Sequence, residues 1–217
     1  MNRPIRRIGV LTLAMVLVLL GNLSWVQVVQ APALTGDPRN IRTQLAEYSR
    51  PRGQISAGGQ LLASSVPTGD AQRYLRRYPD GGQSAPITGY FSPVYGATGL
   101  EAAAGSLLDG SDPALLFHRL SALLTGRDRS PANVVTTIDP QMQAIAYRDL
   151  TSKGYTGAVV AIEPATGALL AMASTPSFDP NPLAAHNPAA EQAAWTADNA
   201  AQPAPLRDRA ISETYPP

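Results

Sequence analysis

Cysteine is absent from the 217 residues, and lysine occurs once, as Lys153. Without cysteine the chain can form no disulfide, carries no thiol nucleophile and offers no sulfur ligand to a metal. No serine stands three residues before Lys153, so the sequence contains no Ser-x-x-Lys motif, and it also lacks Ser-x-Asn and Lys-Thr-Gly. A serine nucleophile paired with a lysine base is therefore missing from these residues.

Neither sign of charge dominates, because 17 basic and 16 acidic side chains leave a net charge of +1. A nucleic-acid partner is not expected without a basic excess. His118 and His186 lie far apart and have no cysteines beside them, which makes zinc a poor hypothesis, and His118 is expected to be a partly exposed helix residue. No phosphate-binding or dinucleotide-binding glycine loop occurs. We expect no metal and no cofactor, and we interpret Glu163 as a solvated turn residue rather than a general base.

The N-terminus carries a long apolar run behind three arginines. Arg3, Arg6 and Arg7 precede residues that are mostly apolar from Ile8 to Val29. As a helix this run would be roughly 33 Å long, enough to cross a bilayer core of about 30 Å. We expect a single-pass anchor at the cell membrane, with the arginines cytoplasmic and the bulk of the chain extracytoplasmic. The alternative is a signal peptide cleaved near residues 31–33, Ala-Pro-Ala.

Turn and capping residues divide the rest of the chain into short elements. The expected elements are a short helix over Ile41–Tyr48, a hairpin over Arg52–Ser65 with its turn at Gly58-Gly59, helices that begin at Thr98, Asp112 and Asp139 and end at Gly110, Gly126 and Gly154, and a strand pair over Ala158–Ile162 and Ala168–Ala173.

Two segments look irregular in the sequence. Residues 73–95 are rich in turn formers, and the chain from Ser174 onward is rich in Pro, Asn and Asp and is expected to be mostly loop. A strand pair alone is marginally stable in water, so we expect residues 136–217 to be poorly ordered in isolation after Ala173. Residues 39–129 are expected to be better ordered.

The order of the motifs resembles class B penicillin-binding proteins, most closely the actinobacterial penicillin-binding protein A type. The resemblance covers nearly the whole chain, and its specificity comes from several blocks in the right order after an N-terminal anchor. The matching blocks are Arg52-Gly53-Gln54-Ile55 with Leu62-Ala63-Ser64, Arg77-Tyr78-Pro79 with Ile87-Thr88-Gly89-Tyr90, Gly99-Leu100-Glu101, Thr137-Ile138-Asp139 with Gln143, Gly157 to Pro180, and Arg209-Ala210-Ile211 with Tyr215-Pro216-Pro217.

The resemblance implies an α+β fold in three parts. Residues 1–30 would be the cytoplasmic tip and transmembrane anchor, and residues 31–135 a small mixed α/β pedestal or dimerisation domain without catalytic residues. Residues 136–217 would be the incomplete start of a transpeptidase domain, an antiparallel sheet flanked by helices. The family's nucleophilic serine would lie just after Pro217, so the resemblance places no catalytic residue on this chain.

In the family, the enzyme cross-links peptidoglycan stem peptides, and β-lactams trap its serine. The resemblance therefore implies part of a D,D-transpeptidase of cell-wall synthesis and division, inactive alone, that meets stem peptides and β-lactams only through the missing part. The alternative is a noncatalytic, membrane-anchored interaction module that binds cell-wall synthesis or division proteins. A substrate-binding or sensor lipoprotein is disfavoured by the absence of a lipobox cysteine.

Overall fold

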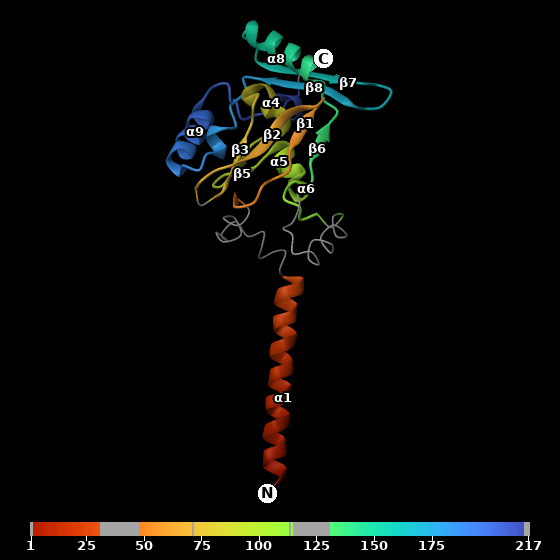
Figure 1. Cartoon of the computed structure of the whole chain (residues 1–217), viewed down its shortest axis with the longest axis vertical. Coiled ribbons are helices and arrows are strands. Elements are labelled where there is room, and N and C mark those ends of the chain that lie inside the picture. Colours follow the sequence, from red (N-terminus) through yellow and green to blue (C-terminus); the bar gives the residue numbers. More distant parts are fainter. Residues whose placement is uncertain (1, 31–47, 71, 113, 115–130, 215–217) are drawn as a thin grey trace. The chain divides into compact units, whose positions relative to one another are not determined.

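The computed structural model describes residues 2–30, 48–70, 72–112, 114 and 131–214 (Figure 1). The chain consists of two compact units, Met1–Ala46 and Glu47–Pro217. The helices expected over 41–48 and from Asp112, and with the latter His118, lie largely outside the described residues.

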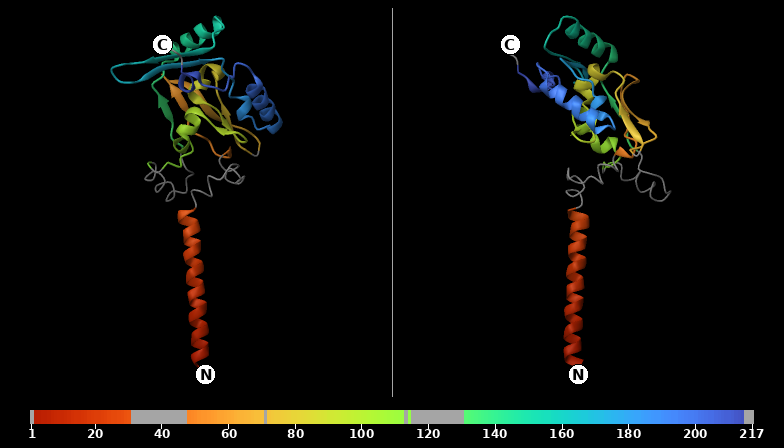
Figure 2. Two further views of the ribbon diagram at one scale, coloured as in Figure 1. Left: turned by 180° about the vertical axis from the view of Figure 1, so that it is seen from behind. Right: turned by 90° about the vertical axis from the view of Figure 1, so that its left-hand side faces the viewer.

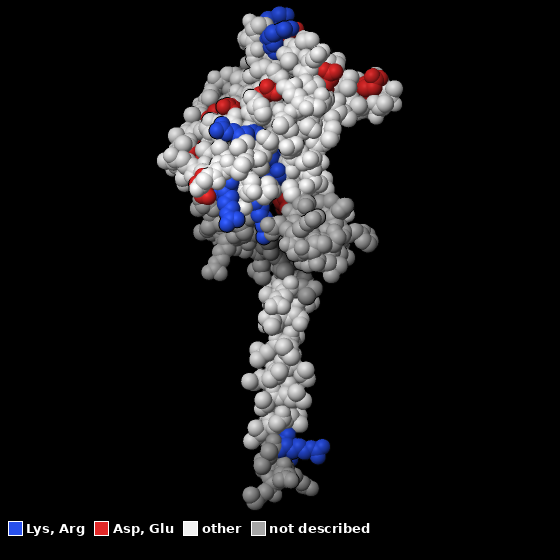
Figure 3. Space-filling model, in the orientation of Figure 1, with Lys and Arg blue, Asp and Glu red and all other residues white. Residues whose placement is uncertain are grey.

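The first unit contains one long apolar helix. Helix α1 spans Asn2–Ser24 and continues as a π-helical turn over Trp25–Val29. The segment Arg6–Gln27 is long and apolar enough to cross a membrane, and none of it is buried against other parts of the protein. Basic side chains mark the N-terminal end of this helix, and the rest of its length is uncharged (Figure 3). The expected apolar helix is confirmed.

A four-stranded sheet forms the centre of the second unit, in the order β3-β2-β1-β6. Strands β1 (Ile55–Ala57) and β2 (Gln60–Pro67) form the expected hairpin, and Gly58 and Gly59 make its turn with positive φ angles of 52° and 84°. Strand β3 (Tyr74–Arg77) pairs antiparallel with β2, and β6 (Val134–Thr136) pairs parallel with β1. The sheet therefore joins segments about 80 residues apart in the chain.

The segment from 73 to 95 is more regular than its turn formers suggested. It contains β3, helix α4 (Gly81–Thr88) and strand β4 (Phe91–Ser92), which pairs with β5 (Gly96–Ala97). The prediction missed α4 because Gly81, Gly82 and Pro86 all argue against a helix. The helix predicted from Thr98 is present as two short pieces, α5 (Gly99–Ala103) and α6 (Gly105–Leu108).

The predicted strand pair is confirmed, with small differences at its ends. Strands β7 (Gly157–Ile162) and β8 (Leu169–Thr175) pair antiparallel around an exposed turn that contains Glu163. Helix α8 (Pro140–Ser152) begins where predicted, because the Asp139 carboxylate accepts hydrogen bonds from the backbone N–H groups of Gln141 and Met142. Figure 2 shows from two further directions that α8 lies against the β7–β8 pair.

The expectation of a loop after Ser174 is wrong. The segment contains a 3-10 turn (Pro182–Ala184), the 13-residue helix α9 (Pro188–Ala200) and helix α10 (Arg209–Ser212). Asn187 caps α9 by accepting from the backbone N–H groups of Ala189 and Ala190, and Pro188 occupies the first helical position. The alanine-rich sequence that follows has high helix propensity, which outweighed the Pro and Asn content.

One apolar core runs through both halves of the second unit. Ile55, Tyr78 and Leu108 from the first half pack together with Ile138 and Ala184 from the second. A second cluster contains Ala85, Tyr90, Phe178 and Leu183, with Trp195 of α9 packed against it. Shared cores of this kind fix the strand pair β7–β8 relative to the four-stranded sheet.

Candidate functional site: a polar junction between the two halves

Backbone carbonyls of helix α4 accept hydrogen bonds from side chains in the second half of the chain. Pro86 has no N–H, so the carbonyl oxygen of Gly82, four residues earlier, lacks its helical donor. Ser177 fills that place, because its hydroxyl donates to the Gly82 oxygen at 2.6 Å. A proline that argued against a helix in the sequence thus creates an acceptor that binds the segment after β8.

Gln143 makes the next link, and it is buried with 2% of its surface exposed. Its side-chain amide donates to the Gln83 carbonyl at 2.8 Å and to the Met172 carbonyl at 3.0 Å. Its Oε1 accepts from the Met172 backbone N–H at 2.8 Å. One side chain therefore ties α8, α4 and β8 together with all of these polar atoms satisfied.

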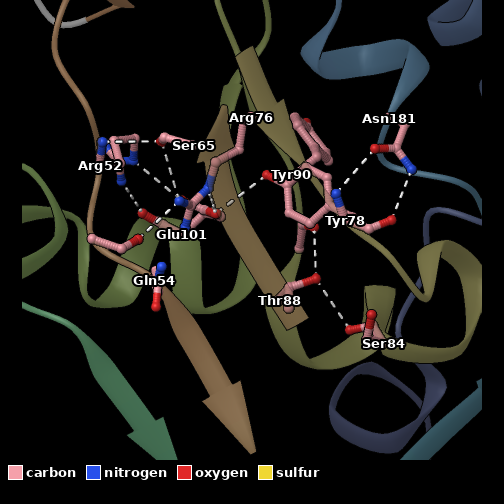
Figure 4. A network of polar contacts seen from close by, with 12 residues as sticks. Arg52, Gln54, Ser65, Arg76, Tyr78, Ser84, Thr88, Tyr90, Glu101 and Asn181 are labelled. Carbon is pink, nitrogen blue, oxygen red and sulfur yellow. Dashed lines mark hydrogen bonds and ion pairs between the residues drawn. The ribbon is translucent and has the colours of Figure 1, made fainter. Parts of the chain in front are cut away.

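Asn181 joins the loop after β8 to the residue that follows β3. Its Oδ1 accepts from the backbone N–H of Tyr78 at 3.0 Å, and its Nδ2 donates to the Tyr78 carbonyl at 2.9 Å. The amide group pairs with the Tyr78 backbone in the way that a neighbouring strand would. Figure 4 shows this pair beside the charged network described next.

A buried ion triad lies behind Tyr78. Glu101 of α5 is 1% exposed, and its two carboxylate oxygens accept from Arg52 Nε at 3.2 Å and Arg76 Nε at 2.6 Å (Figure 4). Arg76 Nη1 also donates to the Gly53 carbonyl at 2.8 Å, and the Tyr78 hydroxyl donates to Glu101 at 3.3 Å. Burial and the neighbouring Glu101 carboxylate raise the pKa of Tyr78 well above its usual value, so the phenol stays neutral.

Aromatic rings extend this network toward β4. The Arg52 guanidinium lies 3.9 Å from the centre of the Phe91 ring, and Tyr48 packs on the same ring at 4.6 Å. The Tyr48 hydroxyl donates to the carbonyl of Ser92. The ion triad is therefore held in place from β4 as well as from the hairpin.

Ser92 in turn contacts helix α9 through Glu191, which is 1% exposed. The Ser92 hydroxyl donates to Glu191 Oε1, and the Val94 N–H donates to the same oxygen at 3.3 Å. Burial raises the pKa of Glu191, and the hydrogen bonds from Ser92 and Val94 oppose that rise. No basic side chain pairs with this carboxylate among the described ion pairs.

This environment predicts the pH dependence of stability. An acid whose pKa is higher in the folded state favours folding at pH values below its unfolded pKa, and that contribution is lost as the pH rises through the folded pKa. Glu191→Gln keeps the oxygen that accepts from Ser92 and removes the charge. We expect thermal unfolding of the variant to match the wild type near pH 4 and to occur at a higher temperature at pH 7.

The control for that experiment is Glu163→Gln in the exposed turn between β7 and β8. This variant should unfold at the same temperature as the wild type at both pH 4 and pH 7. A Glu191→Gln variant that is less stable than the wild type at pH 7 would show that the charged form is the one the fold favours.

Arg209, which belongs to a block of the family resemblance, orients the last described residues. It is 3% exposed, and its guanidinium donates to the carbonyls of Ala204, Arg207 and Pro176. Its backbone N–H donates to Ser174 Oγ at the end of β8. Helix α10 is thereby held against the strand pair.

The residues that the sequence singled out for chemistry are scattered. Lys153 is exposed at the end of α8, where it lies 5.8 Å from the Tyr155 ring, and Glu163 is exposed in its turn. His186 contacts Asp70 and the Tyr74 carbonyl, a position that its sequence context did not indicate. In the described part of the chain, no group of three or more His, Asp or Glu side chains could hold a metal ion.

Sequence reasoning missed most of the junction. Gln143, Ser177 and Arg209 were marked only through the family resemblance, and Asn181 and Glu191 were not marked at all. A buried polar residue in a loop-rich segment carries no periodic signal. The one available cue was the Asn-Pro pair at 187–188, which predicts a helix start.

Two family models match the chain. The penicillin-binding protein A dimerisation domain matches residues 52–134, and the penicillin-binding protein transpeptidase domain matches residues 157–217. The matches divide the second unit into a dimerisation domain and the opening elements of a transpeptidase domain. The hydrogen bonds of the junction connect these two parts. The chain belongs to the class B penicillin-binding proteins, of the penicillin-binding protein A type.

Its relatives include the peptidoglycan D,D-transpeptidases PbpA of Mycolicibacterium smegmatis and Mycobacterium tuberculosis. Each is 50% identical to this chain in an alignment that covers the whole of this chain, and the chain spans 45% of the length of each relative. The ceftriaxone acyl-enzyme complex of penicillin-binding protein A from M. tuberculosis superposes with a TM-score of 0.77 at 50% identity, over 80% of this chain and 40% of that one. A transpeptidase domain from Eggerthella lenta matches with a TM-score of 0.54 at 31% identity, over 74% of this chain and 32% of that one.

Proposed function

We propose that this chain supplies the membrane anchor, the pedestal and the first structural elements of a peptidoglycan D,D-transpeptidase that cross-links stem peptides during cell-wall synthesis and division. The observation that carries the proposal is that the whole chain is 50% identical to a segment that makes up 45% of the length of such an enzyme. The chain is inactive alone, because its 217 residues contain no Ser-x-x-Lys motif.

The reaction of the whole enzyme is acyl transfer. The serine hydroxyl attacks the carbonyl of the penultimate D-Ala of one stem peptide, the terminal D-Ala leaves with its amine, and an ester forms. An amine of a neighbouring stem peptide then attacks the ester, which frees the serine and forms the cross-link. β-Lactams acylate the same serine. Only the complete transpeptidase domain would therefore bind stem peptides and react with β-lactams.

We place the domain boundaries at residues 1–30 for the anchor, 31–135 for the pedestal and 136–217 for the start of the transpeptidase domain. The family matches, which end at 134 and begin at 157, support this division. Strand β6 also supports it, because it closes the pedestal sheet just before α8 begins the second half.

We further propose a single-pass topology with a cytoplasmic N-terminus. Three arginines near the start of helix α1 precede its apolar run, and basic residues are retained on the cytoplasmic side of membrane segments. The unit that follows would then lie outside the cytoplasm, where the peptidoglycan substrate is found.

The role proposed for the pedestal is to position the strand pair on which the transpeptidase domain is built. Hydrogen bonds connect this pair and the loop that follows it to α4 and Tyr78, and they come from Ser177, Gln143 and Asn181. A domain assembled on β7–β8 would inherit that placement. Division or elongation proteins that bind the pedestal could act on the domain through the same bonds.

The competing proposal is a noncatalytic, anchored module that only binds cell-wall synthesis proteins. Reading the gene beyond Pro217 separates the two, because a Gly-Ser-x-x-Lys continuation belongs to an enzyme and a stop codon to a module.

Labelling with a fluorescent penicillin tests the proposal on the protein itself. We expect no covalent label on the purified 217-residue chain in detergent, and one label per molecule on the same chain extended through its own downstream sequence. A Ser→Ala change in the downstream Ser-x-x-Lys motif is the matched control and should abolish the label. Stoichiometric labelling of the 217 residues would show that the nucleophile has been misplaced.

A further inference from the structure

A small basic depression lies where β2 and β3 meet the loop that precedes α9. Its volume is about 10 Å³, which is room for about one water-sized sphere. It is lined by Tyr48, Arg50, Arg52, Ser65, Tyr74, Arg76, Phe91, Ala184 and His186. Three of the described lining residues are arginines and none of them is acidic, and Arg52 and Arg76 both pair with Glu101. Basic side chains also gather on the face that carries β3 (Figure 3).

One residue that lines this depression has a buried donor without an acceptor among the described residues. Arg76 is 4% exposed, and its Nη2 atom is buried without a hydrogen-bond partner among the described residues. The other guanidinium nitrogens of Arg76 bond to Glu101 and to the Gly53 carbonyl. A buried charged donor left unsatisfied is costly, and in native proteins it usually marks an ordered water or an ion.

Two acceptors in the lining of the depression already have donors. Ser65 Oγ already accepts from the Arg52 N–H at 3.0 Å, and the Tyr74 carbonyl already contacts His186 Nε2 at 3.0 Å. A water molecule would need acceptors for its own two hydrogens, and the lining offers few. An anion needs donors alone, so the lining suits an anion better than water.

His186 lies on the same wall. Its Nδ1 contacts the Asp70 carboxylate and its Nε2 contacts the Tyr74 carbonyl, so both ring nitrogens face acceptors. Hydrogen bonds from Thr68 and His186 lower the pKa of Asp70, which keeps this carboxylate ionised as the partner of the ring. Asp70 itself does not line the depression.

We propose that this depression binds a small monovalent anion of chloride size, held by Arg76 Nη2 with Arg50 and His186 at its rim. The anion would sit between the pedestal strands and the 184–186 segment of the second half. Its binding would therefore stabilise the junction between the two halves. This site is separate from the transpeptidase chemistry and does not depend on it.

Chloride-dependent unfolding of the full chain in detergent tests the proposal. At constant ionic strength, replacing sodium gluconate by sodium chloride should raise the unfolding temperature along a saturable curve, whereas sodium acetate should not. Arg50→Gln should weaken the apparent chloride affinity about tenfold, the effect of losing one charge-assisted hydrogen bond. Arg77→Gln, an exposed arginine next to Arg76 on β3, is the matched control and should leave the curve unchanged.

Line broadening of ³⁵Cl in nuclear magnetic resonance gives a second readout that does not depend on unfolding. The wild type and Arg77→Gln should broaden the chloride line and bromide should reverse the effect, whereas His186→Gln and Arg50→Gln should broaden it less. Absence of any chloride effect in the wild type, or equal effects in Arg50→Gln and Arg77→Gln, would overturn the proposal. A saturable effect of acetate equal to that of chloride would overturn the choice of a chloride-sized anion.

Discussion

Replacing Glu101 by glutamine is expected to destabilise the second unit by about 3–5 kcal/mol, the usual cost of removing one partner from a buried ion pair. The carboxylate accepts from both Arg52 and Arg76, and all three side chains are almost fully buried. Glutamine keeps one oxygen acceptor, but its amide NH₂ group would face a guanidinium that also only donates. Two positive charges would then share the interior without their common carboxylate.

Urea unfolding measures this effect. In a Trp25→Phe background Trp195 is the remaining tryptophan of the chain, and its contact with Tyr90 and Tyr95 makes its fluorescence a reporter of the second unit. Glu163→Gln makes the same chemical change at an exposed turn and is expected to cost less than about 0.5 kcal/mol. Equal unfolding midpoints for the two variants would mean that the triad does not stabilise the fold.

The second large effect is expected at Gly89, which ends helix α4 with a φ of 67°. A Cβ atom there would lie 2.1 Å from the Thr98 carbonyl oxygen. Gly89→Ala therefore combines backbone strain with a steric overlap that only a backbone shift can relieve. We expect a loss of about 2–5 kcal/mol, made up of about 1–2 kcal/mol for the strain and about 1–3 kcal/mol for the overlap.

Gly167→Ala separates the two causes. Gly167 has a similar φ of 73° in the turn between β7 and β8, and no atom lies within 4 Å of where its Cβ would be. Its substitution should cost only the strain, about 1–2 kcal/mol. If the two alanine variants unfold at the same urea concentration, the close approach of Gly89 and Thr98 is not a constraint on the fold.

The sequence predicted the elements that local chemistry determines. The Gly58-Gly59 turn, the Asp139-Pro140 helix start and the strand pair around Glu163 need only near neighbours, and all three are confirmed. The apolar N-terminal helix follows from composition in the same way.

The sequence failed where distant partners decide the outcome. Helix α4 forms despite Pro86, because Ser177 from far along the chain satisfies the freed Gly82 carbonyl. The junction links single polar side chains to partners far along the chain, 60 residues away for Gln143 with Gln83 and 103 residues away for Asn181 with Tyr78. No local pattern marks such pairs, and only the family resemblance brought Gln143 into view.

The central structural claim is that the pedestal and the opening of the transpeptidase domain fold as one bonded unit. Amide hydrogen exchange by mass spectrometry on the full chain in detergent tests it directly. The junction predicts slow exchange in β8 and in helix α9, comparable with that of the β1–β2 hairpin. The sequence alone predicted fast exchange after Ala173, and fast exchange throughout 174–200 beside a protected hairpin would contradict the account.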